Sequence, residues 1–284
     1  MKIIECPRDA MQGIERFIPT DIKANYINSL LKVGFDTIDF GSFVSPKIMP
    51  QMQDTGELLG LLDLSNSNSK LLAIIANRRG AEDATSFQEV TYLGYPLSLS
   101  ETFQQRNTNR SIVQAMEDLQ YIQELCVKHE KTLVTYLSMG FGNPYGDPYD
   151  EGFIEEFVGK LEKMNVKIIS LSDTIGVSSA ESITKNLGGV INKFPNIEFG
   201  VHLHARPDDV KEKIAAAYAV GCQRFDGALM GFGGCPMAED DLVGNVATEI
   251  MLDYFDTVGI ETNLNMEAFF ESLKIASSIF SQYT

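Results

Sequence analysis

The chain has 284 residues, 44% of them hydrophobic, and its 23 lysines and arginines against 39 aspartates and glutamates give a formal net charge of −16 at pH 7. This length predicts one domain, residues 1–284, with a sizeable core. The negative charge argues against a nucleic-acid partner and against an anionic membrane surface, because both require a basic face. The four cysteines are widely spaced, and no signal peptide or membrane span is visible, so we expect a reduced cytoplasmic protein.

Short apolar stretches typical of buried strands alternate with amphipathic helical stretches along the chain. The expected strands are Lys2 to Glu5, Thr37 to Phe43, Leu71 to Ala76, Val90 to Leu97, Thr132 to Ser138, Lys167 to Leu171, Ile197 to His204 and Arg224 to Met230. A helix capped by Thr20 is expected to end at Gly34, and apolar residues from Ile112 to Cys126 follow one helical face. A last helix is expected within Asn263 to Tyr283, with its inward face formed by Met266, Phe269, Phe270, Leu273 and Phe280.

Two segments of the chain resemble each other. Val33 to Gly41 and Val220 to Gly227 both read as a helix end, a glycine, and a strand that ends near an acid and a glycine. Eight strand–helix units in about 250 residues match one barrel, so the predicted fold is α/β, a TIM (β/α)8 barrel with an additional C-terminal helix. The alternative is an open doubly wound sheet, which requires a glycine-rich loop after the first strand; Cys6 to Ala10 form no such loop.

Catalytic side chains of such a barrel lie at the C-terminal ends of its strands. His202 and His204 are placed there, and side chains two residues apart on a strand point to the same face. The two imidazoles are therefore expected to share a metal ion or, alternatively, to bond to core carbonyls. The third histidine, His129, falls near a helix end, where its charge suits the helix dipole.

Asp9, after the first strand, and Asn245, in the loop after the last strand, are candidate further ligands. Their alternative roles are a loop cap and a helix cap. One carboxylate, two imidazoles and one amide oxygen suit a six-coordinate Mg²⁺ or Mn²⁺ ion, with Zn²⁺ or Co²⁺ as weaker matches. Two coordination positions would stay open, which suits a chelating anionic substrate.

Cys235 lies in the glycine-rich loop of residues 231–236, beside the expected barrel mouth. A thiol there is a candidate acid/base or lid residue, or else an incidental cysteine in a tight turn. Other polar side chains expected near the C-terminal ends of strands are Arg8, Asp39, Ser42, Asp173 and Thr174.

Five segments of the chain together resemble the 3-hydroxy-3-methylglutaryl-CoA lyases. They are CPRDAMQ (6–12), SFVSPKIMPQM (42–52), SDTIG (172–176), HLH (202–204), and GGCP (233–236) followed by GNVATE (244–249). The Arg-Asp and His-x-His pieces are shared with a wider superfamily of metal-dependent lyases and acyl-CoA condensing enzymes. The resemblance implies a TIM barrel, a divalent metal ion, and cleavage of 3-hydroxy-3-methylglutaryl-CoA to acetyl-CoA and acetoacetate.

The resemblance also implies roles for single residues. Arg8 would hold the thioester carbonyl where enolate charge develops, Asp173 would be an acid/base partner near the substrate hydroxyl, and Cys235 would take part in proton transfer. The metal ligands would be Asp9, His202, His204 and Asn245, with His202 also in the catalytic set. Substrate contacts are expected from Asp39, Ser42, Thr174 and Gln12, and a homodimer is expected.

Three positions depart from the family pattern. Ala205-Arg206-Pro207 replaces the usual Asp-Thr after the second histidine, Asp39 replaces a glutamate, and Ala10 replaces a glycine. These changes are expected at the rim of the site, where they would affect which acyl-CoA is the substrate more than which class of reaction is catalysed. The anionic CoA moiety needs a local basic patch, for which the available residues are Lys47, Arg78, Arg79 and Arg106.

Two other functions are weighed against the lyase. An acetyl-CoA-dependent 2-oxo acid condensing enzyme shares the Arg-Asp and His-x-His pieces, but the Gly-Gly-Cys-Pro loop and the lack of a C-terminal regulatory domain favour the lyase. An inactive homologue that only binds metal or acyl-CoA is disfavoured by the joint presence of the candidate catalytic residues and ligands.

Overall fold

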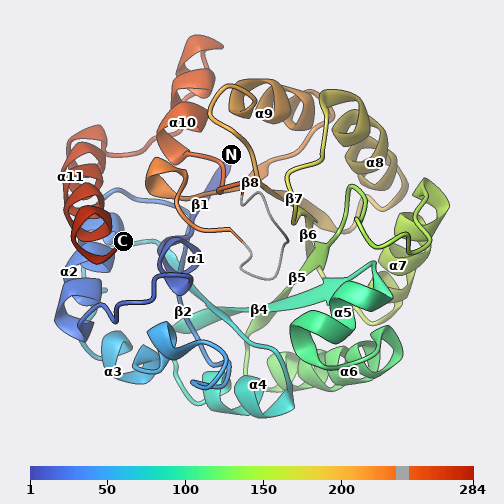
Figure 1. Cartoon of the computed structure of the whole chain (residues 1–284), viewed down its shortest axis with the longest axis horizontal. Coiled ribbons are helices and arrows are strands. Elements are labelled where there is room, and N and C mark those ends of the chain that lie inside the picture. Colours follow the sequence, from blue (N-terminus) through green and yellow to red (C-terminus); the bar gives the residue numbers. More distant parts are fainter. Residues whose placement is uncertain (235–242) are drawn as a thin grey trace.

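The structure, a computed structural model, describes residues 1–234 and 243–284, apart from the side chain of Glu151. Eight parallel strands follow one another around a closed barrel, with β8 paired to β1. They are β1 Lys2–Glu5, β2 Thr37–Ser42, β3 Lys70–Ile74, β4 Val90–Ser98, β5 Thr132–Ser138, β6 Ile168–Asp173, β7 Glu198–Leu203 and β8 Arg224–Gly227. Figure 1 shows these strands at the centre of a ring of helices. The predicted TIM barrel is therefore confirmed, and the open sheet is excluded.

The helices of the described residues connect successive strands and surround the barrel (Figure 1). They are α1 Pro7–Gln12, α2 Thr20–Leu31, α3 Thr55–Leu59, α4 Arg78–Thr85, α5 Glu101–Thr108, α6 Ile112–Lys128, α7 Glu151–Lys163, α8 Ala180–Lys193, α9 Val210–Ala219, α10 Thr248–Thr257 and α11 Met266–Tyr283, with 3-10 turns Pro50–Met52 and Leu229–Gly231. Several begin at side chains that accept a hydrogen bond from the first turn, as Asn77, Ser111 and Ser179 do. None of the described helices is long and apolar enough to cross a membrane.

Some predicted boundaries were wrong for local reasons. Strand β8 ends at Gly227, before the predicted Met230, because Met230 adopts a left-handed φ of 63° within a 3-10 turn. Thr20 is the first residue of α2 rather than its cap, and its hydroxyl donates to Asp54 instead. On the additional C-terminal helix, Phe269 and Phe280 are buried as predicted, whereas Met266 and Phe270 are exposed.

The apolar core has two parts. The larger part lies between the strands and the surrounding helices, and a smaller cluster fills the inside of the barrel with Leu72, Ile74, Tyr92, Val134, Tyr136 and Ile168. Parallel strands buried on both faces explain the continuous apolar runs in the sequence. Because this inner cluster closes the middle of the barrel, polar side chains at the C-terminal ends of the strands lie in a cavity that has a floor.

A buried acid, Glu5, links β1 to the segments that follow β8. Its carboxylate accepts hydrogen bonds from the backbone N–H of Leu229 (2.8 Å) and the hydroxyl of Thr248 (2.7 Å). Burial outweighs these hydrogen bonds and raises the pKa of Glu5 from 4.5 to about 8. Between these pH values the folded chain holds a proton that the unfolded chain has lost, so this group makes stability fall as pH rises.

Replacement of Glu5 by glutamine is therefore expected to flatten the dependence of melting temperature on pH between pH 5 and 8 (about the window of the shift). The uncharged amide can still accept from Leu229 and donate to Thr248. Melting curves of the wild type, E5Q and the exposed-site control E15Q would measure this. Parallel curves for E5Q and the wild type would contradict the assignment.

Candidate active site

The short helix α1 carries two adjacent charged residues into the mouth of the barrel. It starts directly after β1, with Pro7 in its first turn, and Arg8 and Asp9 are both buried. The Arg8 guanidinium contacts Asp39 on β2 from Nε (3.0 Å) and Nη2 (2.5 Å), and its Nη1 donates to Asp9 (2.9 Å) and Gln12 (2.7 Å). Arg8 is therefore fixed in one orientation by groups on three sides.

The Asp9 carboxylate is held from both of its oxygens. Gln12 Nε2 donates to Oδ1 (2.6 Å), and Asn245 Nδ2 donates to Oδ2 (2.5 Å). Burial acts to raise the pKa of Asp9, but the charges of Arg8 and His202 outweigh it and lower that pKa. Asp9 is thus an ionised, oriented carboxylate at neutral pH.

The two predicted histidines lie next to this carboxylate. The ring centroids of His202 and His204 are 5.5 Å apart, and each of the two rings and Asp9 can offer one ligand atom, all within 4.8 Å of one another. Burial, together with the neighbouring His202, lowers the pKa of His204 to about 4, so its imidazole is neutral at pH 7 and keeps a lone pair for a metal. The predicted cluster of Asp9, His202 and His204 is therefore present.

His202 also belongs to a second group, with Cys6 and Asp226. Burial and the surrounding acids raise the pKa of the Cys6 thiol well above its ordinary value, so that it stays protonated and is a poor ligand. The ionised carboxylate and neutral imidazole of the first group are instead the donors that a divalent ion accepts. The residues present therefore fit a metal at Asp9, His202 and His204.

Asn245, the predicted fourth ligand, lies beside these residues. Its backbone pairs with that of His204, and its amide nitrogen contacts Asp9 and the carbonyl of Phe232. The loop around Gly233 passes so close that an added Cβ would approach Asn245 Nδ2 to 2.5 Å, at a φ of +96°. Only glycine can occupy that position, which explains part of the Gly-Gly-Cys-Pro motif.

A cavity of about 470 Å³ opens over the candidate ligands. Its polar floor includes Arg8, Asp9, Asp39, Thr174 and both histidines of the cluster. Its remaining wall is largely apolar, with side chains from the loops after β2 and β3, from β4 and from α5, among them Val44, Ile48, Met49, Pro96 and Phe103. Such a site binds a ligand with one charged, chelating end and a longer, less polar part.

The structure places some predicted residues elsewhere. Ser42 is buried and bonds to backbone atoms of Ile74 and Val44. Asp173 does not line the cavity: its carboxylate accepts from two backbone N–H groups and from the buried ammonium of Lys213 (3.1 Å). Cys235 lies outside the described residues.

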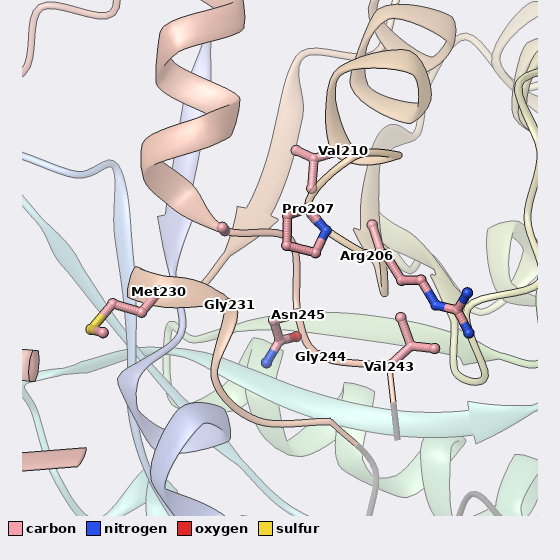
Figure 2. Close-up of a pocket in the computed structure, with 10 residues that line it drawn as sticks. Arg206, Pro207, Val210, Met230, Gly231, Val243, Gly244 and Asn245 are labelled. Carbon is pink, nitrogen blue, oxygen red and sulfur yellow. The ribbon is translucent and has the colours of Figure 1, made fainter. Parts of the chain in front are cut away.

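The departures from the family pattern are not all at the rim. Asp39 is 1% exposed and binds Arg8 at the floor of the cavity, so the expectation of a rim position was wrong for this residue. Ala205-Arg206-Pro207 line a separate cavity of about 310 Å³, to which Asn245 also contributes. Figure 2 shows the side chain of Arg206 directed away from Asn245.

Sequence reasoning missed two buried charged residues next to the site. Asp226 on β8 contacts the His202 ring, and Lys213 on α9 donates to Asp173 and to the carbonyl of His204. A signal for Asp226 was present, because the two similar segments of the chain align Asp226 with Asp39. Each of these acids holds a functional side chain, Asp39 the guanidinium of Arg8 and Asp226 the ring of His202.

A closed (β/α)8 barrel with a buried carboxylate, two imidazoles and an arginine at its C-terminal mouth defines an enzyme of the TIM-barrel class with a candidate metal centre. The HMGL-like family model matches residues 2–275. The chain belongs to this HMGL-like family.

Named relatives and solved structures agree with this family. The mitochondrial hydroxymethylglutaryl-CoA lyase of Mus musculus is 30% identical over 276 residues, which cover 96% of this chain and 83% of that protein. The HMG-CoA lyase structure of Pseudomonas aeruginosa has a TM-score of 0.90 at 29% identity, covering 98% of this chain and 92% of that one. An HMG-CoA lyase of Acinetobacter baumannii in complex with coenzyme A and 3-methylmalate has a TM-score of 0.89 at 27% identity, covering 98% and 91%. The chain is therefore an oxo-acid lyase of the hydroxymethylglutaryl-CoA lyase type.

Proposed function

We propose that this protein cleaves 3-hydroxy-3-methylglutaryl-CoA, or a closely related hydroxyacyl-CoA, to acetyl-CoA and a 3-oxo acid, acetoacetate in the first case, with the help of a divalent metal ion. The observation that carries the proposal is the cluster of Asp9, His202 and His204 beside Arg8 on the floor of one cavity. The complex of the Acinetobacter relative with coenzyme A and 3-methylmalate supports a CoA thioester as substrate.

Asp9, His202, His204 and Asn245 would hold Mg²⁺ or Mn²⁺. When bound, the ion would supply positive charge that lowers the pKa of the substrate hydroxyl. Loss of the hydroxyl proton allows the carbon–carbon bond to break, with its electron pair passing to the thioester fragment as an enolate. A proton then returns to the enolate carbon, which completes acetyl-CoA.

Arg8 is placed to stabilise the enolate oxygen. A guanidinium has five N–H donors; Asp39, Asp9 and Gln12 take the Nε donor, both Nη1 donors and one Nη2 donor. The second Nη2 donor is then left for the substrate. A positively charged donor that is already fixed in place stabilises developing negative charge without reorganisation.

Two residues have proposed proton-transfer roles. Asp173 stays the proposed acid/base partner near the substrate hydroxyl, as the family resemblance implies; its oxygens accept from Val177, Ser178 and Lys213, and its neighbour Thr174 lines the cavity. Cys235 stays the proposed donor to the enolate carbon, as the family resemblance implies.

The CoA moiety has a candidate path out of the cavity. A neighbouring pocket shares Val44, Ile48 and residues 107–109 with the cavity. This pocket in turn shares Asn77 and Arg110 with a third pocket, which Arg78 and Arg79 also line. Acids are present there as well, since Arg78 pairs with Asp118 at 2.6 Å. Of the predicted basic residues, Arg78 and Arg79 support a phosphate contact at the end of this path, and Arg106 lines the cavity itself.

A coupled assay with 3-hydroxy-3-methylglutaryl-CoA tests the proposal. We expect acetoacetate formation that requires Mg²⁺ or Mn²⁺ and stops with chelator, and a higher KM at unchanged kcat in the double variant R79A/R110A. Activity on a related thioester alone would retain the reaction class and change the substrate. Condensation of acetyl-CoA with a 2-oxo acid, or metal binding without turnover, would replace the proposal by one of the two alternative functions.

Cytoplasmic location and a homodimer complete the proposal. The described cysteines Cys6, Cys126 and Cys222 are free thiols, which supports a reducing compartment. Cell fractionation and light scattering of the purified protein would test the location and the dimer.

A further inference from the structure

The His202 ring has a buried carboxylate behind it. Asp226 Oδ2 lies 3.2 Å from His202 Nδ1, and the two residues are neighbours on β7 and β8. The side chain of Asp226 is fully buried and that of His202 is 15% exposed. In the neutral ring, an acceptor at Nδ1 holds the hydrogen there and leaves Nε2 as the lone-pair nitrogen.

The second imidazole of the cluster, His204, packs against the first, with ring centroids 5.5 Å apart and an interplanar angle of 64°. The His202 ring is fixed further by edge contacts with Tyr136, at 5.8 Å and 85°, and with His204. His202 is therefore oriented from behind by a carboxylate, which is the usual support of a metal-binding histidine.

The contact with His202 is the one hydrogen bond that the Asp226 carboxylate makes within the described residues. Within the described residues its other oxygen, Oδ1, has no hydrogen-bond partner, although burying a carboxylate is costly unless it is paired. Arg224, two residues back on β8 and also fully buried, forms no hydrogen bond to the described residues, and its Nη1 lies 3.6 Å from Glu198. Burial acts to lower the pKa of Arg224, but the charge of Asp226, ahead of that of Glu198, raises it, so the two buried charges on β8 stabilise each other. Gly200 leaves room for this arginine, because a Cβ atom at position 200 would lie only 3.0 Å from the Arg224 side chain.

We propose that Asp226 is a positioning residue that orients His202 toward a divalent cation shared with Asp9 and His204, with Arg224 as the buried counter-charge of its carboxylate. The inference rests on the metal site of the proposed function and adds to it a residue that does not itself touch the ion or the substrate.

The test is the dissociation constant for Mn²⁺ of the purified full chain, measured from free Mn²⁺ by electron paramagnetic resonance. D226A removes the acceptor and is expected to weaken Mn²⁺ binding by about 10- to 100-fold. D226N keeps one acceptor oxygen and is expected to lie between D226A and the wild type. D36N is the matched control, because Asp36 faces Arg224 at 4.0 Å and does not contact His202; its Mn²⁺ affinity is expected to equal that of the wild type.

The outcomes separate the inference from the proposed function. Wild-type protein that binds no Mn²⁺ would refute the metal site and the inference together. Wild-type binding that is unchanged in a folded D226A would overturn the inference alone. If D226A does not fold, D226L removes the same acceptor while filling the space, and it carries the same expectation and the same refutation; melting curves establish which variants are folded.

Discussion

Replacement of Arg8 by glutamine is expected to lower kcat for the CoA thioester by about 10²- to 10³-fold, the usual loss when a preorganised donor to an oxyanion is removed. Glutamine supplies neither the charge nor the fork of donors that Arg8 directs at Asp39, Asp9 and Gln12. Metal binding is expected to persist, because Asp9 keeps its hydrogen bonds from Gln12 and Asn245. Steady-state kinetics and a Mn²⁺ titration of R8Q measure the two effects separately.

The matched control for R8Q is R16Q, which changes an exposed arginine next to α1. R16Q is expected to retain wild-type kinetics. Turnover of R8Q within about twofold of the wild type, a factor too small for loss of an oxyanion donor, would remove Arg8 from the mechanism.

Replacement of His204 by alanine is expected to weaken Mn²⁺ binding by about a hundredfold or more, since loss of a supporting residue behind a ligand already costs 10- to 100-fold. Activity is expected to fall with metal occupancy. The imidazole is neutral at pH 7, so the loss reflects a missing lone pair rather than a changed charge. Free Mn²⁺ during titration and acetoacetate formation at saturating Mn²⁺ are the two measurements.

His129 offers a matched control for H204A. It is exposed at the end of α6, so H129A removes the same side chain without touching the cavity. Mn²⁺ affinity that is equal in H204A, H129A and the wild type would contradict the metal site itself, and with it the mechanism proposed for the lyase.

Much of the fold follows from local patterns. The strand Thr132–Ser138 was predicted with its observed bounds, because an apolar run of this length between polar ends has no other stable place than a buried parallel strand. The ends of β8 and α2 were less accurate. A single left-handed residue, Met230, and a hydroxyl bonded to a distant acid, Thr20, decided them.

The candidate site was predicted in part for a similar reason. His202 and His204 point to one face because side chains alternate along a strand, and this geometry needs no knowledge of the rest of the chain. The position of Asp173 depended instead on Lys213, 40 residues away, whose ammonium fixes the carboxylate outside the cavity. Nothing in the SDTIG segment itself shows that the partner exists.

The sequence alone determined which elements form, in which order, and which chemical groups reach the C-terminal ends of the strands, because each of these depends on short-range periodicity and on motifs read within a few residues. The tertiary structure alone decided which group faces which. Asp9 meets Asn245 across 236 residues of sequence, Arg8 meets Asp39, and His202 meets Asp226. These pairs exist only once the barrel closes and brings β8 beside β1, since a hydrogen bond requires a distance and a direction that the order of residues does not specify.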